Sequence, residues 1–211
     1  MKLSELEGTL QRLGFTENNI VEIIMITVNP NGSFNPAPMG VINRGDHLEV
    51  RPFTTSDTYR NLRKNNLASI NLTNEPVLFL KSAFKHELDE KTSISELFLE
   101  GSDATIIAEK TGEDAFSSSQ ASVILRPKRV VIHNDSPTVY SRGRAMVIEA
   151  IIHATRVSVY HSMGDEAKVE YLLKSMHYCF DVITRVSATD SPDMQVVDNL
   201  KALLEKWGVS I

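Results

Sequence analysis

Two short stretches of the chain carry the residues that could bind a ligand. The first, Asn35–Gly40, places two prolines and a glycine inside a run that is otherwise typical of a β-strand. Proline donates no backbone hydrogen bond and glycine has no side chain to pack, so such a strand suits an edge where backbone lies close to a ligand. The alternative is that the prolines only protect a strand edge from pairing.

The second stretch, Arg51–Thr58, leads into a helix that we expect to begin near Ser56. The free N–H groups and the positive dipole end of a helix N-terminus attract anions. Hydroxyl groups gather at this point, on Thr54, Thr55, Ser56 and Thr58. An ordinary helix N-cap would explain them without a ligand. Because two ligand-shaped irregularities rarely coincide by chance, we instead predict a flavin mononucleotide (FMN) site, with a backbone platform and a phosphate cradle.

The order and spacing of three pieces are similar to those of the FMN-binding split barrel of flavin-reductase-like proteins. The pieces are Asn35–Val41, Arg51–Leu62 and Ala68–Leu72. Over most of its length the chain also resembles an uncharacterised, largely archaeal family of that superfamily. In that family, a C-terminal helical signature is similar to Arg142–Arg156.

The resemblance implies FMN as the cofactor and places residues around it. Along the isoalloxazine ring it places Ala37, Pro38, Met39 and Gly40. Around the phosphate it places Thr54, Thr55, Ser56 and Thr58, with Arg51 as a counter-charge. Phe53 and Asn71 complete the implied cofactor-binding set, Asn71 as the polar position on the following strand that reaches the flavin.

The resemblance also implies a function and partners. It favours an FMN-dependent oxidoreductase that works as a homodimer, in which the interface completes each flavin pocket. The flavin itself performs the redox chemistry, so no catalytic side chain is predicted. A reduced nicotinamide nucleotide is the expected electron donor, although no nicotinamide-binding segment is recognisable. The alternative is a non-catalytic FMN-binding protein, such as a carrier or a sensor.

Hydrophobic periodicity indicates the elements that must position these stretches. Residues 1–139 are expected to form a small antiparallel β-barrel, which the resemblance identifies as a split barrel, so the fold class is α+β and mainly β. The expected strands are 20–28, 34–42, 47–51, 67–73, 104–109 and 121–133, and the expected helices are 3–14, 56–66 and 76–84.

Three expectations concern burial. Residues 67–73 alternate apolar with polar side chains and are expected to form a half-buried strand, with Asn71 facing the site. Residues 85–100 are strongly charged and are expected to be a surface excursion, with a solvated loop preferred over a functional lid. In the last strand, Val130–Ile132 is predicted to be the clearest part of the core.

Residues 140–211 are expected to form a helical extension, an antiparallel hairpin packed on the barrel or on a dimer partner. Ala145–Val157 has apolar residues on nearly all sides, which predicts a helix buried between two surfaces, one of them possibly a second subunit. Val169–Val186 shows a cleaner apolar stripe. A third apolar run follows Ser191–Pro192, a typical helix start, and ends at Gly208.

Composition excludes several functions. A formal net charge of −5 argues against non-specific binding to nucleic acid or to an anionic membrane, and no apolar run approaches the about 20 residues needed to span a bilayer. The chain has one cysteine, Cys179, so an intrachain disulfide is impossible, and a buried core thiol is preferred over a reactive one. With no apolar segment of a signal peptide at the N-terminus, the expected location is the cytoplasm.

Other polar groups are better explained without chemistry. Glu149 and His153 are spaced to pair on one helix face and could act as acid and base, but a structural contact is the commoner case. A basic group could meet an anion, but a solvated or salt-bridged face is preferred; it comprises Arg126, Lys128, Arg129, Arg142 and Arg144. The six histidines show no metal-binding spacing, so no metal is predicted.

Overall fold

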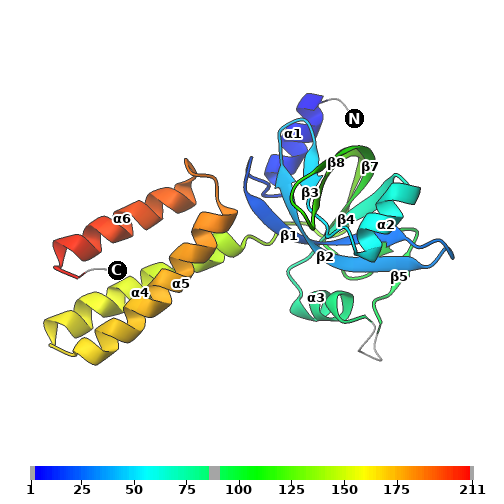
Figure 1. The fold of residues 1–211 in the computed structure, drawn as a ribbon. Coiled ribbons are helices and arrows are strands. Elements are labelled where there is room, and N and C mark those ends of the chain that lie inside the picture. Colours follow the sequence, from blue (N-terminus) through cyan, green and yellow to red (C-terminus); the bar gives the residue numbers. More distant parts are fainter. Residues whose placement is uncertain (1–2, 86–90, 210–211) are drawn as a thin grey trace. The chain divides into compact units, whose positions relative to one another are not determined.

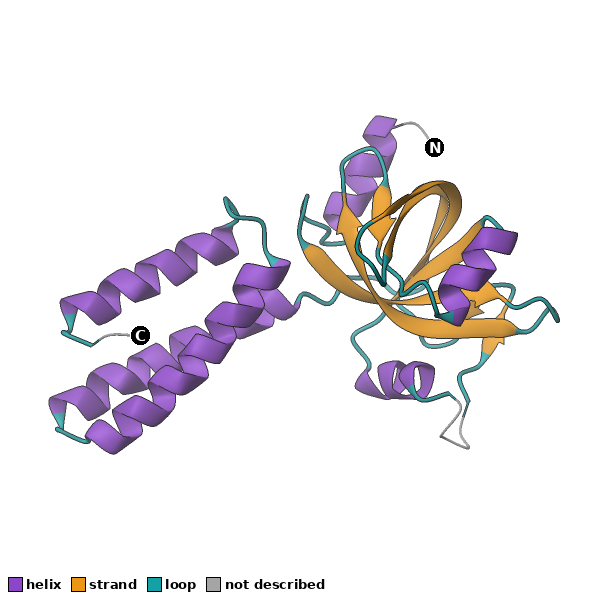
Figure 2. Ribbon diagram, viewed as in Figure 1, coloured by secondary structure: helices purple, strands orange, loops and turns teal. Residues whose placement is uncertain are grey.

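A computed structural model describes residues 3–85 and 91–209 of the chain. Contacts divide the chain into two compact units, residues 1–140 and residues 141–211. The first unit is built mainly from strands and the second from helices (Figures 1 and 2). Part of the charged segment 85–100, residues 86–90, lies outside the described residues.

The first unit is a closed barrel of antiparallel strands in the order β1-β2-β3-β8-β7-β4 (Figure 1). Its strands are β1 (Ile20–Val28), β2 (Phe34–Asn43), β3 (Leu48–Val50), β4 (Leu67–Leu72), β7 (Ala104–Ala115) and β8 (Ala121–Ile132). The expected antiparallel barrel is therefore confirmed. The predicted helices are also present, as α1 (Leu3–Arg12), α2 (Asp57–Lys64) and α3 (Pro76–Ala83).

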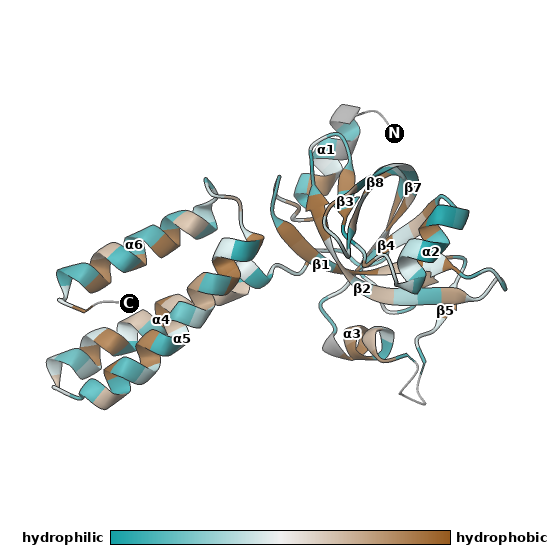
Figure 3. Cartoon of the chain, viewed as in Figure 1, coloured by the Kyte–Doolittle hydropathy of each residue, from teal (hydrophilic) through white to brown (hydrophobic). Residues whose placement is uncertain are grey.

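The barrel interior holds the main core of this unit. Side chains that alternate along each strand point inward, as the pleat requires. The largest of them, all fully buried, include Ile23, Met25, Leu48, Ile70, Ile106 and Leu125. Leu10 and Leu13, near the end of α1, belong to the same cluster, so α1 buries its apolar face against the barrel. The hydrophobic colouring in Figure 3 runs along these strands.

A second apolar layer covers the outer face of β1. Ile24 and Ile26 pack there with Leu97 and Leu99 of a small hairpin, β5 (Ile94–Ser95) and β6 (Phe98–Leu99), and with side chains of α3. Because β1 is covered on both faces, nearly all of its residues are apolar. The hairpin falls in the segment expected to be a solvated excursion, so its described part is structural.

The same hairpin overturns the expectation that residues 67–73 form a half-buried strand. Every residue of β4 except Leu67 is buried. The polar side chains of its outer face lie under the hairpin, where Ser69 Oγ donates to the Leu97 carbonyl at 2.6 Å. They are polar because they bond to backbone groups of the hairpin, and not because they face water.

The predicted core of β8 is also wrong. Val130 and Val131 are only partly buried and Ile132 is 51% exposed, whereas Val123 and Leu125 are fully buried. Successive residues of a strand face opposite sides, so three consecutive β-branched residues cannot all enter one core. A register shift in the β7–β8 ladder beside Ile107 and Ala108 then changes which residues of β8 face inward.

The second unit contains three helices, α4 (Arg142–Ser162), α5 (Glu166–Val186) and α6 (Pro192–Lys206). The predicted hairpin is α4–α5, and α6 packs against both. Gly143 allows the close approach of α4 to the end of α5, because a β-carbon at this position would lie 2.6 Å from Ser187 Oγ. Among the described residues, no helix is long and apolar enough to cross a membrane.

The expectation that α4 is buried on all sides does not hold within this unit. Ala150, Ala154 and Val157 face α5 and α6, but Ile148 is 57% exposed and Ile151 is 40% exposed. The helix therefore has a second apolar face that neither α5 nor α6 covers.

Replacing a β8 residue that faces the core should test this assignment. Leu125→Ala should lower the free energy of unfolding by about 2–5 kcal/mol, because it opens a cavity in the barrel interior. Ile132→Ala on the same strand should change it by about 0.5 kcal/mol or less. Urea unfolding of both variants measures the difference, and equal losses would contradict it.

Candidate functional site

The two ligand-binding stretches adjoin in the structure. Asn35 on β2 donates from Nδ2 to Thr58 Oγ1 on α2 at 3.2 Å, and also to Thr27 Oγ1 on β1 at 3.2 Å. Asn61, one turn further along α2, donates to Thr27 Oγ1 at 3.0 Å and to Asn29 Oδ1 at 2.8 Å. This buried network fixes the start of α2 to the proline-bearing half of β2.

One edge of β2 is open. The strand pairs with β1 along its whole length, from Phe34 to Ile42, but with β3 only from Val41 onward. Among the described strands, none pairs with the other edge over Phe34–Gly40. We call this stretch the open edge.

The prolines determine which groups the open edge offers. Pro36 and Pro38 stand opposite Ile26 and Ile24 in an unbroken register with β1. A proline fits such a ladder when its nitrogen faces the unpaired side, and the carbonyl of an antiparallel residue faces the same side as its nitrogen. The open edge therefore presents two carbonyl acceptors, and neither proline offers an N–H.

The implied ring-binding residues lie on this strand. Ala37, Pro38, Met39 and Gly40 are all half-buried. Met39 packs against the barrel core. Gly40 has a structural reason of its own, because a β-carbon there would lie 2.9 Å from Ile20 Cγ2 on β1.

Most of the predicted hydroxyl cradle is engaged within the protein. Ser56 caps α2, since its Oγ accepts from the Tyr59 N–H at 3.2 Å and donates to the Phe53 carbonyl at 2.7 Å. Thr58 belongs to the buried network and is 3% exposed. Thr54 Oγ1 donates to the Ser119 carbonyl at 3.3 Å. Thr55 is exposed and makes no hydrogen bond among the described residues, so its hydroxyl is available.

Arg51 is held by a buried carboxylate. Its Nε donates to Glu49 Oε1 at 2.6 Å, and Glu49 also accepts from Arg44 Nε at 2.7 Å and from Ser122 Oγ at 3.0 Å. The Arg51 guanidinium carbon lies 3.9 Å from the centre of the Phe116 ring. Burial alone would raise the pKa of Glu49, but these hydrogen bonds outweigh it and keep the pKa below its ordinary value.

The two remaining implied contacts differ in exposure. Phe53 is 57% exposed and bridges to Gln120 of the β7–β8 turn. Asn71 is fully buried under the β5–β6 hairpin. Its Oδ1 accepts from the Leu99 N–H at 3.2 Å and from Thr105 Oγ1 at 2.8 Å, and its Nδ2 donates to the Ile24 carbonyl at 3.3 Å. The Asn71 amide thus joins β4, β1 and the hairpin.

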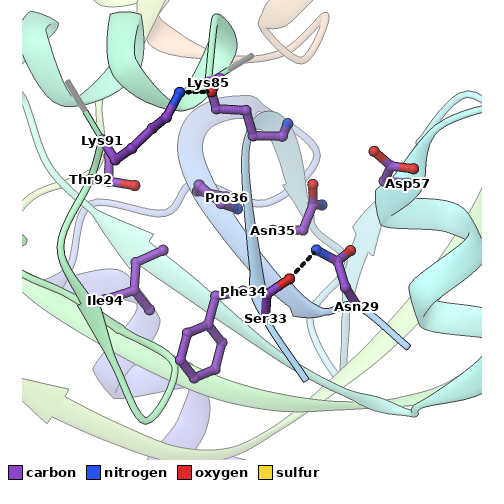
Figure 4. A pocket seen from close by; sticks show the side chains of 10 residues that line it. All are labelled: Asn29, Ser33, Phe34, Asn35, Pro36, Asp57, Lys85, Lys91, Thr92 and Ile94. Carbon is purple, nitrogen blue, oxygen red and sulfur yellow. Dashed lines mark hydrogen bonds between the residues drawn. The ribbon is translucent and has the colours of Figure 1, made fainter. Parts of the chain in front are cut away.

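A pocket of about 380 Å³ opens beside the start of the open edge (Figure 4). It is lined by residues of β2, the β1–β2 turn, α2 and the segment before β5: Asn29, Ser33, Phe34, Asn35, Pro36, Asp57, Lys85, Lys91, Thr92 and Ile94. This volume lies within the range of small-molecule sites. Sequence reasoning missed Lys85 and Lys91, because only the folded chain brings that segment to β2.

The polar groups of the helical unit show no arrangement for catalysis. His153 Nε2 lies 3.4 Å from Glu149 Oε1, a contact within one helix. Burial, and secondarily the Glu149 charge, raise the pKa of the Cys179 thiol, which favours the unreactive protonated form. Of the predicted basic group, Lys128 pairs with Glu109 at 2.5 Å. No three His, Cys, Asp or Glu side chains of the described residues are grouped to hold a metal ion.

Comparison with family models gives two matches. Residues 21–134 match the model described as "Protein of unknown function (DUF447) N-terminal domain", and residues 141–194 match "Protein of unknown function (DUF447)". The matches cover well over half of the chain and fall on the two structural units. The resemblance to an uncharacterised family is confirmed.

Solved structures share the fold. An FMN-bound protein of Methanosarcina mazei from the DUF447 family is 23% identical, with a TM-score of 0.52 over 90% of this chain and 99% of that chain. The styrene monooxygenase flavin reductase of Pseudomonas putida is 11% identical, with a TM-score of 0.49 over 57% of this chain and 83% of that chain. An FMN-binding protein of Thermus thermophilus is 14% identical, with a TM-score of 0.44 over 54% of this chain and 71% of that chain.

The Glu49 cluster should stabilise the barrel in a pH-dependent way. Glu49→Gln should lower the free energy of unfolding at neutral pH by about 1–3 kcal/mol, because it removes charge-assisted hydrogen bonds. The folded-state pKa of Glu49 lies below 4.5, so its contribution is present above that pH and is lost as the pH falls through the folded-state value. The difference between wild type and variant should therefore shrink in acid.

Urea unfolding at neutral and acidic pH measures this effect. Glu109→Gln is the control, because the Glu109–Lys128 pair is largely exposed and should contribute about 0–1 kcal/mol. An equal loss in both variants would contradict a special role for Glu49.

Proposed function

The chain belongs to the DUF447 family of proteins of unknown function, and we propose that it is a flavoprotein that binds FMN at the open edge of β2. The observation that carries the proposal is the Asn35–Thr58 hydrogen bond, which joins the proline-bearing edge to the start of α2. A family member from Methanosarcina mazei bound to FMN supports it.

The open edge suits the polar side of an isoalloxazine ring. That side carries an N–H between two carbonyl groups, and the carbonyl oxygens of Pro36 or Pro38 can accept from this N–H. Half-buried Ala37, Met39 and Gly40 continue the platform. A backbone platform of this kind orients the ring without any side chain that could react with it.

The phosphate end of FMN would lie at the start of α2. The first N–H groups of a helix have no intrahelical acceptor, and the available Thr55 hydroxyl adds a donor. Ser56 contributes indirectly, because its cap begins the helix at this point. FMN, when bound, supplies hydride or single-electron chemistry, and the protein orients the ring and adjusts its electronics.

We further propose a flavin-dependent oxidoreductase that takes electrons from a reduced nicotinamide nucleotide. The alternative is a non-catalytic carrier or sensor, which the absence of an acid–base pair among the described pocket residues does not disfavour. Anaerobic titration of the FMN-loaded protein with NADH and NADPH separates the two. Bleaching of bound FMN faster than of free FMN indicates the enzyme, and no acceleration with either nucleotide indicates the alternative.

The exposed face of α4 supports a homodimer. Ile148, Ile151, Ile152 and Val159 are each at least 37% exposed and recur at helical spacing. Contiguous apolar surface of this kind marks a protein interface in many soluble proteins. The free thiol of Cys179 suits a reducing compartment such as the cytoplasm.

FMN should bind with one molecule per chain and give a yellow protein. Thr55→Ala should weaken binding about tenfold or more, because a hydrogen bond to a charged group contributes about 1.5–3 kcal/mol. Quenching of flavin fluorescence on titration measures both affinities. Thr184→Ala, which removes an exposed hydroxyl from α5, is the control and should bind as wild type does. Wild-type protein that binds no FMN would refute the proposal.

The oligomeric state should depend on the exposed face of α4. We expect wild-type protein to be a dimer, and Ile148→Glu to dissociate it, because an unpaired carboxylate buried in an interface is costly. Size-exclusion chromatography with light scattering measures the mass. Thr184→Glu places the same charge on the exposed side of α5 and should leave the dimer intact. A monomeric wild type would contradict the assignment.

A further inference from the structure

We propose that Lys85, and not Arg51, is the cation that recognises the phosphate of FMN and makes the site prefer FMN over riboflavin. This inference rests on the proposed function, because it assigns one residue of the same site. It is carried by the pairing of Arg51, the placement of Lys85 and the charges of the other pocket residues.

Arg51 is committed to the scaffold. Its guanidinium is bound to Glu49, which is 7% exposed, and stacks on the Phe116 ring. Turning Arg51 toward a phosphate would break that ion pair, and removing one partner of a buried pair is strongly destabilising. Arg51 is also absent from the residues that line the pocket. Its charge therefore holds β3 and the following loop, and does not bind a ligand.

Lys85 has the opposite character. Its side chain extends into the pocket, toward the side where Asn35 and Asp57 lie (Figure 4). Within the described part of the chain, its ammonium has no printed partner for a hydrogen bond or an ion pair. The backbone of Lys85 is held in place, because its carbonyl accepts from Lys91 Nζ. A fixed backbone with an uncommitted ammonium is what an anion requires.

The other polar groups of the pocket leave this role to Lys85. Both N–H bonds of the Asn35 amide are used, toward Thr27 and Thr58. Asp57 carries the one carboxylate among the lining residues, and it is paired with Arg60 on the outside of α2. Lys91 adds a second positive charge to the same wall. The pocket thus presents a net positive wall opposite the start of α2.

Phosphate chemistry then explains a preference between flavins. FMN and riboflavin share the ring and the ribityl chain and differ only in the phosphate, which carries about −1.5 to −2 charge near neutral pH. A lysine binds phosphate as a point charge. Lys85 should therefore contribute to the affinity for FMN and contribute nothing to that for riboflavin.

The test compares dissociation constants of full-length protein for FMN and riboflavin, measured by flavin fluorescence. Lys85→Met should weaken FMN about ten- to a hundredfold and change riboflavin by less than about twofold. Lys85→Arg, which keeps the charge, should retain most of the preference. In wild type, the affinity for FMN should fall with added salt, and in Lys85→Met this dependence should be weaker.

Arg51→Gln provides the matched control. It should leave the ratio of the two affinities unchanged, whatever it does to stability, because riboflavin binding reports whether the ring site is intact. Equal losses for both flavins in Lys85→Met, or a lost preference in Arg51→Gln with the preference kept in Lys85→Met, would overturn the inference while FMN binding stood. Wild type that binds neither flavin would overturn the proposed function itself.

Discussion

Buried polar groups between β2 and α2 must satisfy one another, and the candidate site depends on that requirement. Asn35 and Asn61 are each 2% exposed, and Thr58 is 3% exposed. Leaving one such group without a partner costs about 1–3 kcal/mol. The helix therefore has one favourable position against the strand, and the helix N-terminus, the open edge and the pocket keep a common geometry. A hydrophobic contact would fix this position less strictly, because it has no direction.

The prolines of β2 make the open edge a site and not a liability. An unpaired edge normally invites another strand, because it offers alternating donors and acceptors. With Pro36 and Pro38 facing outward, the edge offers carbonyl oxygens without the matching N–H groups. A second strand would find half of its partners missing, but a ligand with a single N–H would not. Edge protection and ligand binding are thus the same property.

Local periodicity was enough to predict most strands and helices, because their apolar patterns and turns lie within a few residues of each other. The bounds of β1 and α3 follow directly from Ile20–Val28 and from the proline at position 76. The failures at Val130–Ile132 and around Asn71 have a tertiary origin, a register shift in one case and a covering hairpin in the other. Lys85 carried no signal, because a lysine in a charged segment looks like any solvated lysine.

The two kinds of cation around the site divide its work. Arginine offers a planar fork of donors, and in this chain both Arg44 and Arg51 direct that fork at Glu49, where it stabilises β3. Lysine carries a compact charge on a flexible stem, which can follow a ligand without disturbing a packed pair. A carboxylate with two arginines therefore makes a rigid base, and the free ammonium belongs on the side that meets the ligand. Exchanging the two residue types would weaken both functions at once.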